Sequence, residues 1–145
     1  MKIEQIHDMW VVDSKFDDLN LDTESLSIES LHAKYNRILS DCRMQLRALV
    51  INRRTHVNTL REYYLGNLNN PDDLKRINRE PFAQRVLKNE VHNHVDSDDD
   101  LIKIDSKIAI AEEQVEVVTE IIKMIHKRSF NIRASIDWKK FTSGF

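Results

Sequence analysis

Residues 104–125 read IDSKIAIAEEQVEVVTEIIKMI, and this stretch has the clearest periodicity of the 145-residue chain. Its apolar residues alternate steps of four and three, which is the heptad spacing of a helix that packs along one seam. A second apolar row lies beside the seam, so the helix is expected to contact a long helix of its own chain and also a second copy. The residues expected at the contact between copies are Ile104, Ile108, Val115, Val118, Ile122 and Ile125. A single buried helix in a monomeric bundle is the alternative.

The helical period also runs through residues 25–64, where apolar residues recur at three- and four-residue steps. Gly66 and the asparagines after it are residues that end a helix and turn the chain, so a long helix is expected to stop there. A first helix is expected near residues 2–10, and a short one near residues 82–88. The sequence PDDLK at residues 71–75 is expected to form a turn.

Composition supports a fold made of helices. The chain has only two glycines and two prolines, and 32% of its residues are charged. Such a composition predicts an all-α fold. Together with the apolar periodicity, it predicts long helices packed as a hairpin or bundle and an oligomerising C-terminal helix. Residues 1–66 are expected to form N-terminal helices with a candidate DNA-binding face. Residues 67–100 form an irregular linker with a short helix, and residues 101–145 an oligomerisation helix with a basic tail.

Several function classes are excluded or disfavoured by the residues present. Phosphate-binding loops need two or three closely spaced glycines, so a nucleotide-hydrolysing P-loop cannot be formed. No nucleophile, base and acid grouping or zinc-ligand spacing stands out, so we expect no enzyme, no cofactor and no metal. The lone Cys42 and the absence of a secretion signal or an apolar span indicate a reducing compartment, the cytoplasm, and no membrane contact.

An acidic tract precedes the helix that contains residues 104–125. Asp96, Asp98 and Asp100 have the spacing of the first three ligands of a calcium loop. The next required positions are Leu101 and Lys107, where such a loop needs glycine and glutamate. The tract is therefore predicted to cap the free N–H groups at the start of the helix.

Basic residues gather in two parts of the chain. Residues 31–66 contain seven basic and two acidic residues, and the part from Ile121 onward contains six basic residues and one acidic residue. On a helix, four arginines of the first part lie within about 40° of one another and span about 27 Å. Together with the tyrosine after them they are the expected DNA-binding residues: Arg43, Arg47, Arg54, Arg61 and Tyr63.

The arginine row suggests a groove for single-stranded DNA. Arginine pairs with phosphates and stacks on bases, and Tyr63 is expected to point away from the apolar stripe and offer a stacking surface. The alternatives are a face that only contacts solvent, or a DNA site in the C-terminal cluster of Lys127, Arg128, Arg133, Lys139 and Lys140. Arg53 falls within the apolar stripe, so it is expected to pair with a carboxylate or a helix end.

Three stretches of the chain resemble the UvsY family of phage recombination mediators. They are the sequence EYYLG at residues 62–66, LIKID at residues 101–105, and residues 125–141, which begin IHKRSFNIR and end DWKKF. Their order and spacing agree with the family over essentially the whole chain. In one respect the chain differs: two positions that are basic in the family are Asn58 and Leu60 here.

The resemblance implies a role and a set of partners. It implies a mediator that binds single-stranded DNA and helps a UvsX-like phage recombinase load onto strands covered by single-strand-binding protein, in the cytoplasm of the infected bacterial host. It also implies a ring-like homo-oligomer, a hexamer or a heptamer, held largely by its C-terminal part. The alternative function is a helical assembly or chaperone-like protein that binds partner helices without DNA.

Overall fold

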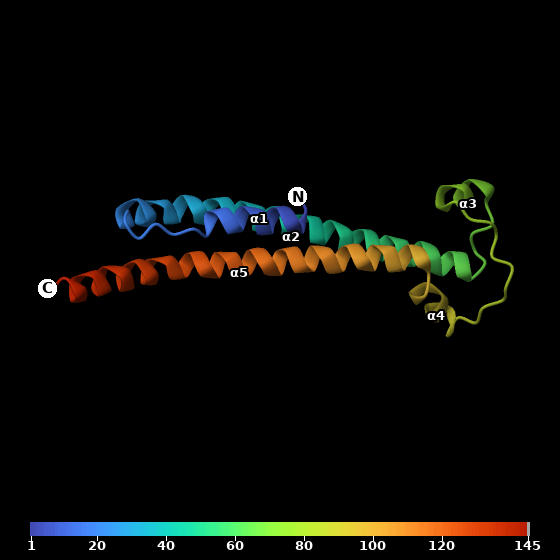
Figure 1. Ribbon diagram of the computed structural model, residues 1–145. Helices are drawn as coiled ribbons and strands as arrows, with labels where there is room; N and C mark the ends of the chain where they lie inside the picture. Colours follow the sequence, from blue (N-terminus) through green and yellow to red (C-terminus); the bar gives the residue numbers. More distant parts are fainter. Residues whose placement is uncertain (145) are drawn as a thin grey trace. The chain divides into compact units, whose positions relative to one another are not determined.

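The computed structural model describes residues 1–144 and consists of α-helices joined by loops, with no β-strand in that range. The all-α prediction is therefore confirmed. The five helices, labelled in Figure 1, are α1 (Ile3–Asp13), α2 (Leu21–Tyr64), α3 (Pro71–Ile77), α4 (Val91–Asp96) and α5 (Asp99–Thr142).

The helices pack into two compact units. Unit 1 contains residues 1–44 and the described residues from Ile110 onward, and unit 2 contains Gln45–Ala109. The long helices α2 and α5 each contribute one part to each unit. Each unit has its own buried apolar cluster.

In unit 1, α1 lies beside the N-terminal part of α2 and the C-terminal part of α5 (Figure 1). Ile6 of α1 and Tyr35 of α2 are fully buried, as are Val118 and Ile125 of α5. The edge of the Tyr35 ring meets Trp10 at a centroid distance of 5.5 Å, which joins α1 to α2. Burial and a hydrogen bond to Asp13 raise the pKa of the Tyr35 hydroxyl.

Two residues of the predicted contact between copies lie in this core. Val118 and Ile125 have no exposed surface, because the seam of α5 packs against α1 and α2 of the same chain. The prediction that these two residues meet another copy is therefore wrong. A heptad seam indicates that a helix has a packing partner, but it does not say whether the partner belongs to the same chain.

One residue of the C-terminal basic cluster is also internal. Arg128 is 6% exposed, and its guanidinium donates hydrogen bonds to the Glu24 carboxylate and to the Asp13 backbone carbonyl. The carboxylate satisfies a charge that would be costly to bury alone. Arg128 is thus unavailable as a phosphate ligand on the surface.

The core of unit 2 forms where the end of α2 meets α4 and the start of α5. Leu60, Val91, Val95 and Leu101 are buried together there. Gly66 ends α2 with a left-handed backbone (φ 80°), and the N–H groups after the helix donate to the carbonyls of Glu62 and Tyr63. This is a Schellman-type stop, and the predicted helix end is confirmed.

The linker between the long helices differs from the prediction. The expected helix at residues 82–88 is absent, and the expected turn at residues 71–75 belongs to α3. The Asn70 side chain caps α3 by accepting from the Asp72 N–H (3.0 Å), and Pro71 occupies the first turn, where its missing N–H costs nothing. Local capping is thus sufficient to form a helix where the sequence predicts a turn.

Asn78 ends α3 and turns the chain so that Arg79 can reach Asp98 and Asp100. It has a left-handed backbone (φ 54°), and the Arg79 N–H donates to the Leu74 carbonyl. The Arg79 guanidinium donates to both oxygens of Asp98 (2.6 and 2.8 Å) and to Asp100 (2.8 Å). The Tyr64 hydroxyl donates to the same Asp98 carboxylate (2.6 Å). The network therefore joins α2, the linker and the start of α5.

Asp98 also caps α5. Its carboxylate accepts from the Asp100 N–H at 2.9 Å, which confirms the predicted role of the acidic tract. Burial raises the pKa of Asp98, but the hydrogen bonds from Arg79, Tyr64 and the Asp100 backbone outweigh it and hold the pKa at about 2. The folded protein thus favours the ionised carboxylate that the network requires.

This lowered pKa predicts an acid-sensitive linker. An unfolded aspartate titrates near about 3.9, so the stabilisation from Asp98 should be complete above that pH and decline as pH falls towards 2. At pH 7, Asp98→Asn should lower the free energy of unfolding by about 2 kcal/mol. Urea unfolding at pH 7, 4 and 3 should show the difference from the wild type narrowing with acid. The control is Asp99→Asn, an exposed neighbour; an equal loss in it would contradict the assignment.

The buried seam gives a second prediction. Val118→Ala should lower the free energy of unfolding by about 2 kcal/mol, because it leaves a cavity in the core of unit 1. Ile110→Ala, at a residue that is 55% exposed on the same helix, should change it by less than about 0.5 kcal/mol. Urea unfolding and sedimentation measure the two effects separately. A Val118→Ala variant of unaltered unfolding but smaller assembly would place the residue between copies.

Candidate nucleic-acid interface

Three of the predicted arginines lie in unit 2, on the part of α2 that runs from residue 45 to 64. Arg47, Arg54 and Arg61 are all exposed, as the predicted row requires. Their spacing of seven residues places successive guanidinium groups on one face, about 10 Å apart along the axis. Arg43 is exposed as well, and it lies in unit 1.

The arginines of this row are not neutralised within the described part of the chain. The ion pairs found there involve other basic residues, and none includes Arg47, Arg54 or Arg61. Glu62, the acidic residue nearest to the row in sequence, accepts a hydrogen bond from the Asn67 side chain instead. The row therefore presents positive charge to solvent.

Arg53 shows why neighbouring arginines have different roles. It lies towards the packed side of α2, where its Nε donates to Asp105 of α5 at 2.5 Å. This hydrogen bond raises the pKa of the guanidinium, against a smaller opposing effect of burial. The prediction that Arg53 finds a carboxylate is confirmed, and the residue contributes to packing rather than to the row.

The face that bears the row also contains exposed apolar side chains. Val50 and Ile51 are 39% and 56% exposed, and they lie between Arg47 and Arg54. An arginine face with apolar residues between the charges can contact phosphates and also the faces of bases. Sequence reasoning missed these two residues because they are ordinary members of an apolar-rich helix.

Tyr63 is not on this surface. Its side chain is 8% exposed, and its hydroxyl donates to the Glu80 backbone carbonyl at 2.8 Å. The Arg79 guanidinium lies 5.1 Å from the ring centroid, and Phe82 packs at 5.6 Å. The prediction that Tyr63 projects outward for stacking is wrong, because the linker after α3 covers that side of the helix end. Its apolar residues Pro81 and Phe82 were the only sequence signal for this cover.

The other residues of the predicted oligomer surface are partly exposed. Ile104 and Ile108 lie in unit 2, and Val115 and Ile122 lie in unit 1 beside its core. The C-terminal part of α5 adds aromatic residues that the prediction omitted: Phe130, Trp138 and Phe141 are 65–74% exposed. The Trp138 and Phe141 rings stack at a centroid distance of 5.8 Å. Large exposed aromatic side chains are typical of protein interfaces.

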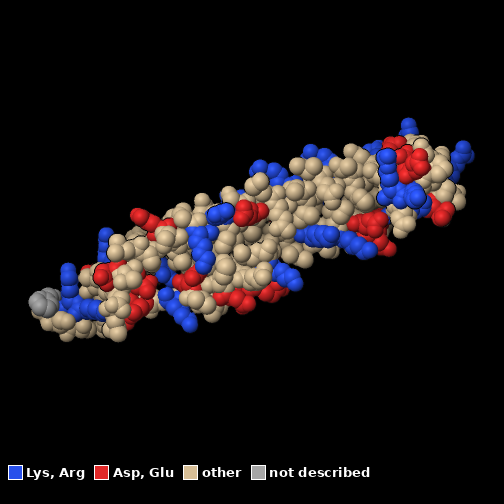
Figure 2. Space-filling model, turned by 90° about the horizontal axis from the view of Figure 1, so that it is seen from above, with Lys and Arg blue, Asp and Glu red and all other residues tan. Residues whose placement is uncertain are grey.

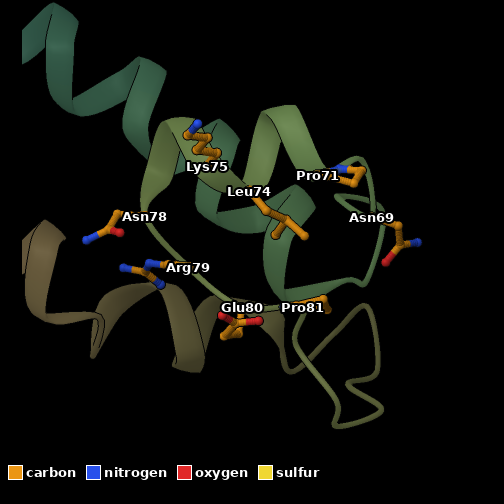
Figure 3. Close-up of a pocket in the computed structure, with 8 residues that line it drawn as sticks. All are labelled: Asn69, Pro71, Leu74, Lys75, Asn78, Arg79, Glu80 and Pro81. Atoms are coloured by element: carbon orange, nitrogen blue, oxygen red, sulfur yellow. The ribbon is translucent and has the colours of Figure 1, made fainter.

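Other surfaces give weaker candidates. On the face drawn in Figure 2, basic side chains are interspersed with acidic ones, so this face has no continuous basic field. A pocket of about 500 Å³ lies beside α3, with Asn69 and Pro71 on one side and Asn78 and Arg79 on the other (Figure 3). The Arg79 guanidinium forms an ion pair with Asp98, and the remaining charged lining residues, Lys75 and Glu80, have opposite charges. That pocket therefore offers no clear excess of charge to a ligand.

Residues 1–144 contain neither a candidate metal site nor a candidate membrane span. No three His, Cys, Asp or Glu residues of this part of the chain come together in a way that could hold a metal ion. Within the same range, none of the helices has an apolar stretch long enough to cross a bilayer.

The chain matches the model of a known protein family. The model of the family described as "Recombination, repair and ssDNA binding protein UvsY" matches residues 9–145. No curated protein matches the chain significantly.

Crystal structures of the bacteriophage T4 recombination mediator protein UvsY share the fold. The lattice type IV structure has a TM-score of 0.84 at 18% identity, covering 97% of this chain and 99% of the T4 chain. The lattice type II structure has a TM-score of 0.82 at 19% identity, covering 99% and 98%. At such identities the likeness concerns the fold alone. The family model spans nearly the whole sequence, and on that ground this chain belongs to the UvsY family.

Proposed function

We propose that this protein is a recombination mediator that binds single-stranded DNA through the arginine row of α2. The observation that carries the proposal is the exposure of Arg47, Arg54 and Arg61 in helical register, without carboxylate partners in the described residues. Regularly spaced guanidinium groups can follow the phosphates of an extended strand, with little dependence on base sequence. Arg43, an exposed arginine of unit 1, is a separate candidate for a phosphate contact.

The proposed role is to load a recombinase. The matching family is described as a recombination, repair and single-stranded-DNA-binding family, and the T4 protein of the same fold is a recombination mediator. We extend this role to the present chain, with a UvsX-like recombinase and a single-strand-binding protein as its partners. It acts without catalysing a reaction, in the cytoplasm of the infected bacterial host.

The row substitutes for basic residues that the family has elsewhere. Asn58 and Leu60 occupy the two positions that are basic in the family pattern, and Leu60 is buried in the core of unit 2. Asn58 is exposed and lies within the row, between Arg54 and Arg61. Arginines one helical heptad apart keep positive charge on this face, which is what phosphate binding requires.

Several copies are proposed to act together on one strand. The partly exposed seam residues Ile104, Ile108, Val115 and Ile122, with the aromatic residues of the C-terminal part of α5, provide apolar surface for contacts between copies. A ring of six or seven copies would present the row many times. Weak contacts on linked copies combine into strong overall binding, because each later contact is intramolecular.

The phosphate contacts predict strong salt dependence. The dissociation constant of single-stranded DNA should rise steeply between 50 and 200 mM salt, and oligonucleotides of different sequence should bind almost equally. Fluorescence anisotropy of labelled oligonucleotides measures both properties. Binding that is absent at low salt would instead favour the alternative function, a helical assembly that binds partner helices.

The arginine row makes a specific prediction by mutation. Replacing Arg47, Arg54 and Arg61 by Ala should weaken DNA binding about tenfold or more at low salt. It should also lower the slope of log affinity against log salt by about 2, which is roughly 0.7 for each lost phosphate contact. The native mass of the assembly should be unchanged. The matched control replaces the exposed Arg85, Lys103 and Lys107, which removes the same charge from unit 2. Equal losses in the two variants would show that only net charge matters.

A further inference from the structure

A pocket in unit 2 adjoins the C-terminal end of the arginine row. It has a volume of about 240 Å³ and lies between α2, α4 and the turn before α4. Arg61, the last arginine of the row, is one of its lining residues. A strand that follows the row towards the end of α2 therefore arrives at the mouth of this pocket.

The walls of the pocket are apolar. Val57 of α2 and Val91 and Val95 of α4 line it, and the two valines of α4 are 3–4% exposed because they also belong to the core of unit 2. The volume is smaller than the roughly 300–1,000 Å³ typical of pockets for drug-sized ligands. A flat single or double ring fits such a space and can place its faces against the valine side chains.

The rim of the pocket is charged and polar. Arg61 and Lys88 contribute two positive charges, and neither forms an ion pair within the described residues. Asn89 can donate and accept hydrogen bonds, and Asp96 accepts them, as the edge of a nucleobase requires. Apolar walls below a rim of net positive charge suit a base whose flanking phosphates stay at the surface. An aliphatic side chain of a protein partner could pack against the valine walls, but it would leave Arg61 and Lys88 without an anionic partner.

We infer that this pocket binds one unstacked base of the strand whose phosphates lie along the arginine row. The inference rests on the proposed function and adds a base contact to it. It explains how the interface can hold a base although Tyr63 is turned inward. Aliphatic walls contact any base, so the contact adds affinity for single strands with little preference for sequence.

The test compares normal and abasic oligonucleotides. The wild-type protein should bind a single-stranded oligonucleotide about fivefold more tightly than a strand of equal length in which the bases are replaced by abasic residues. Both strands carry the same phosphates, so the ratio of the two affinities reports base contacts alone. In Val57→Phe, which fills the pocket, the ratio should fall while affinity for the abasic strand stays the same. Asn52→Phe adds the same ring at an exposed position of α2 and should keep the wild-type ratio.

A second variant avoids any loss of folding. Asn89 is exposed at the rim, and Cys42 is the sole native cysteine and is buried. The Asn89→Cys protein can be folded first and then alkylated with a bulky maleimide, which should close the pocket and lower the ratio. The unmodified Asn89→Cys protein is the control.

The outcomes separate the inference from the proposed function. A ratio of one in the wild-type protein, or a ratio unchanged in both blocked variants, overturns the base pocket and leaves phosphate binding intact. Binding of neither strand at low salt overturns the proposed function itself. The inference is supported if the wild-type protein and the controls prefer the normal strand to the abasic strand, and if Val57→Phe and the alkylated Asn89→Cys protein lose that preference.

Discussion

Removing a guanidinium from water is costly unless a carboxylate goes with it, and this constraint sorts the arginines of the chain. Arg128 in unit 1 is held by Glu24 and a backbone carbonyl, and in unit 2 Arg79 is held by Asp98 and Asp100. Arg53, half-buried, is held by Asp105. Each pair joins segments that are distant in sequence. The arginines that stabilise the fold are therefore neutralised within it and do not add to the surface charge.

The same constraint defines the candidate interface. Arginines that remain without a carboxylate must stay in water, and three of those on α2, Arg47, Arg54 and Arg61, lie on its exposed face at heptad spacing. Arg53 shows the opposite case: it lies on the side of α2 that faces α5, where its Nε donates to Asp105, and it is not part of the row. A structural arginine and a ligand-binding arginine can therefore be adjacent in sequence, as Arg53 and Arg54 are. What distinguishes them is the location of the nearest carboxylate.

Local chemistry allowed much of the fold to be predicted from the sequence. The two long helices follow from their apolar periodicity, and their ends follow from Gly66 and the acidic tract, which act within a few residues. The partners of those periodic faces could not be predicted in the same way. Val118 and Ile125 had the pattern of a contact between helices, and only packing shows that the partner is in the same chain. The sequence predicts a turn at residues 71–75, but these residues form a helix because the Asn70 side chain caps its first turn.

Tyr63 shows that a sequence motif alone does not determine whether its side chains are exposed. Two adjacent tyrosines at the end of a basic helix suggest stacking on bases, yet both make contacts within the protein. The Tyr63 ring packs against Phe82 and Arg79, and the Tyr64 hydroxyl donates to Asp98. The pair fixes the linker against the end of α2, and the same linker continues into the turn and α4 that line the pocket next to Arg61. The two tyrosines thus affect the candidate interface indirectly. They position the linker that leads into α4, and α4 and Arg61 line the pocket proposed to bind a base.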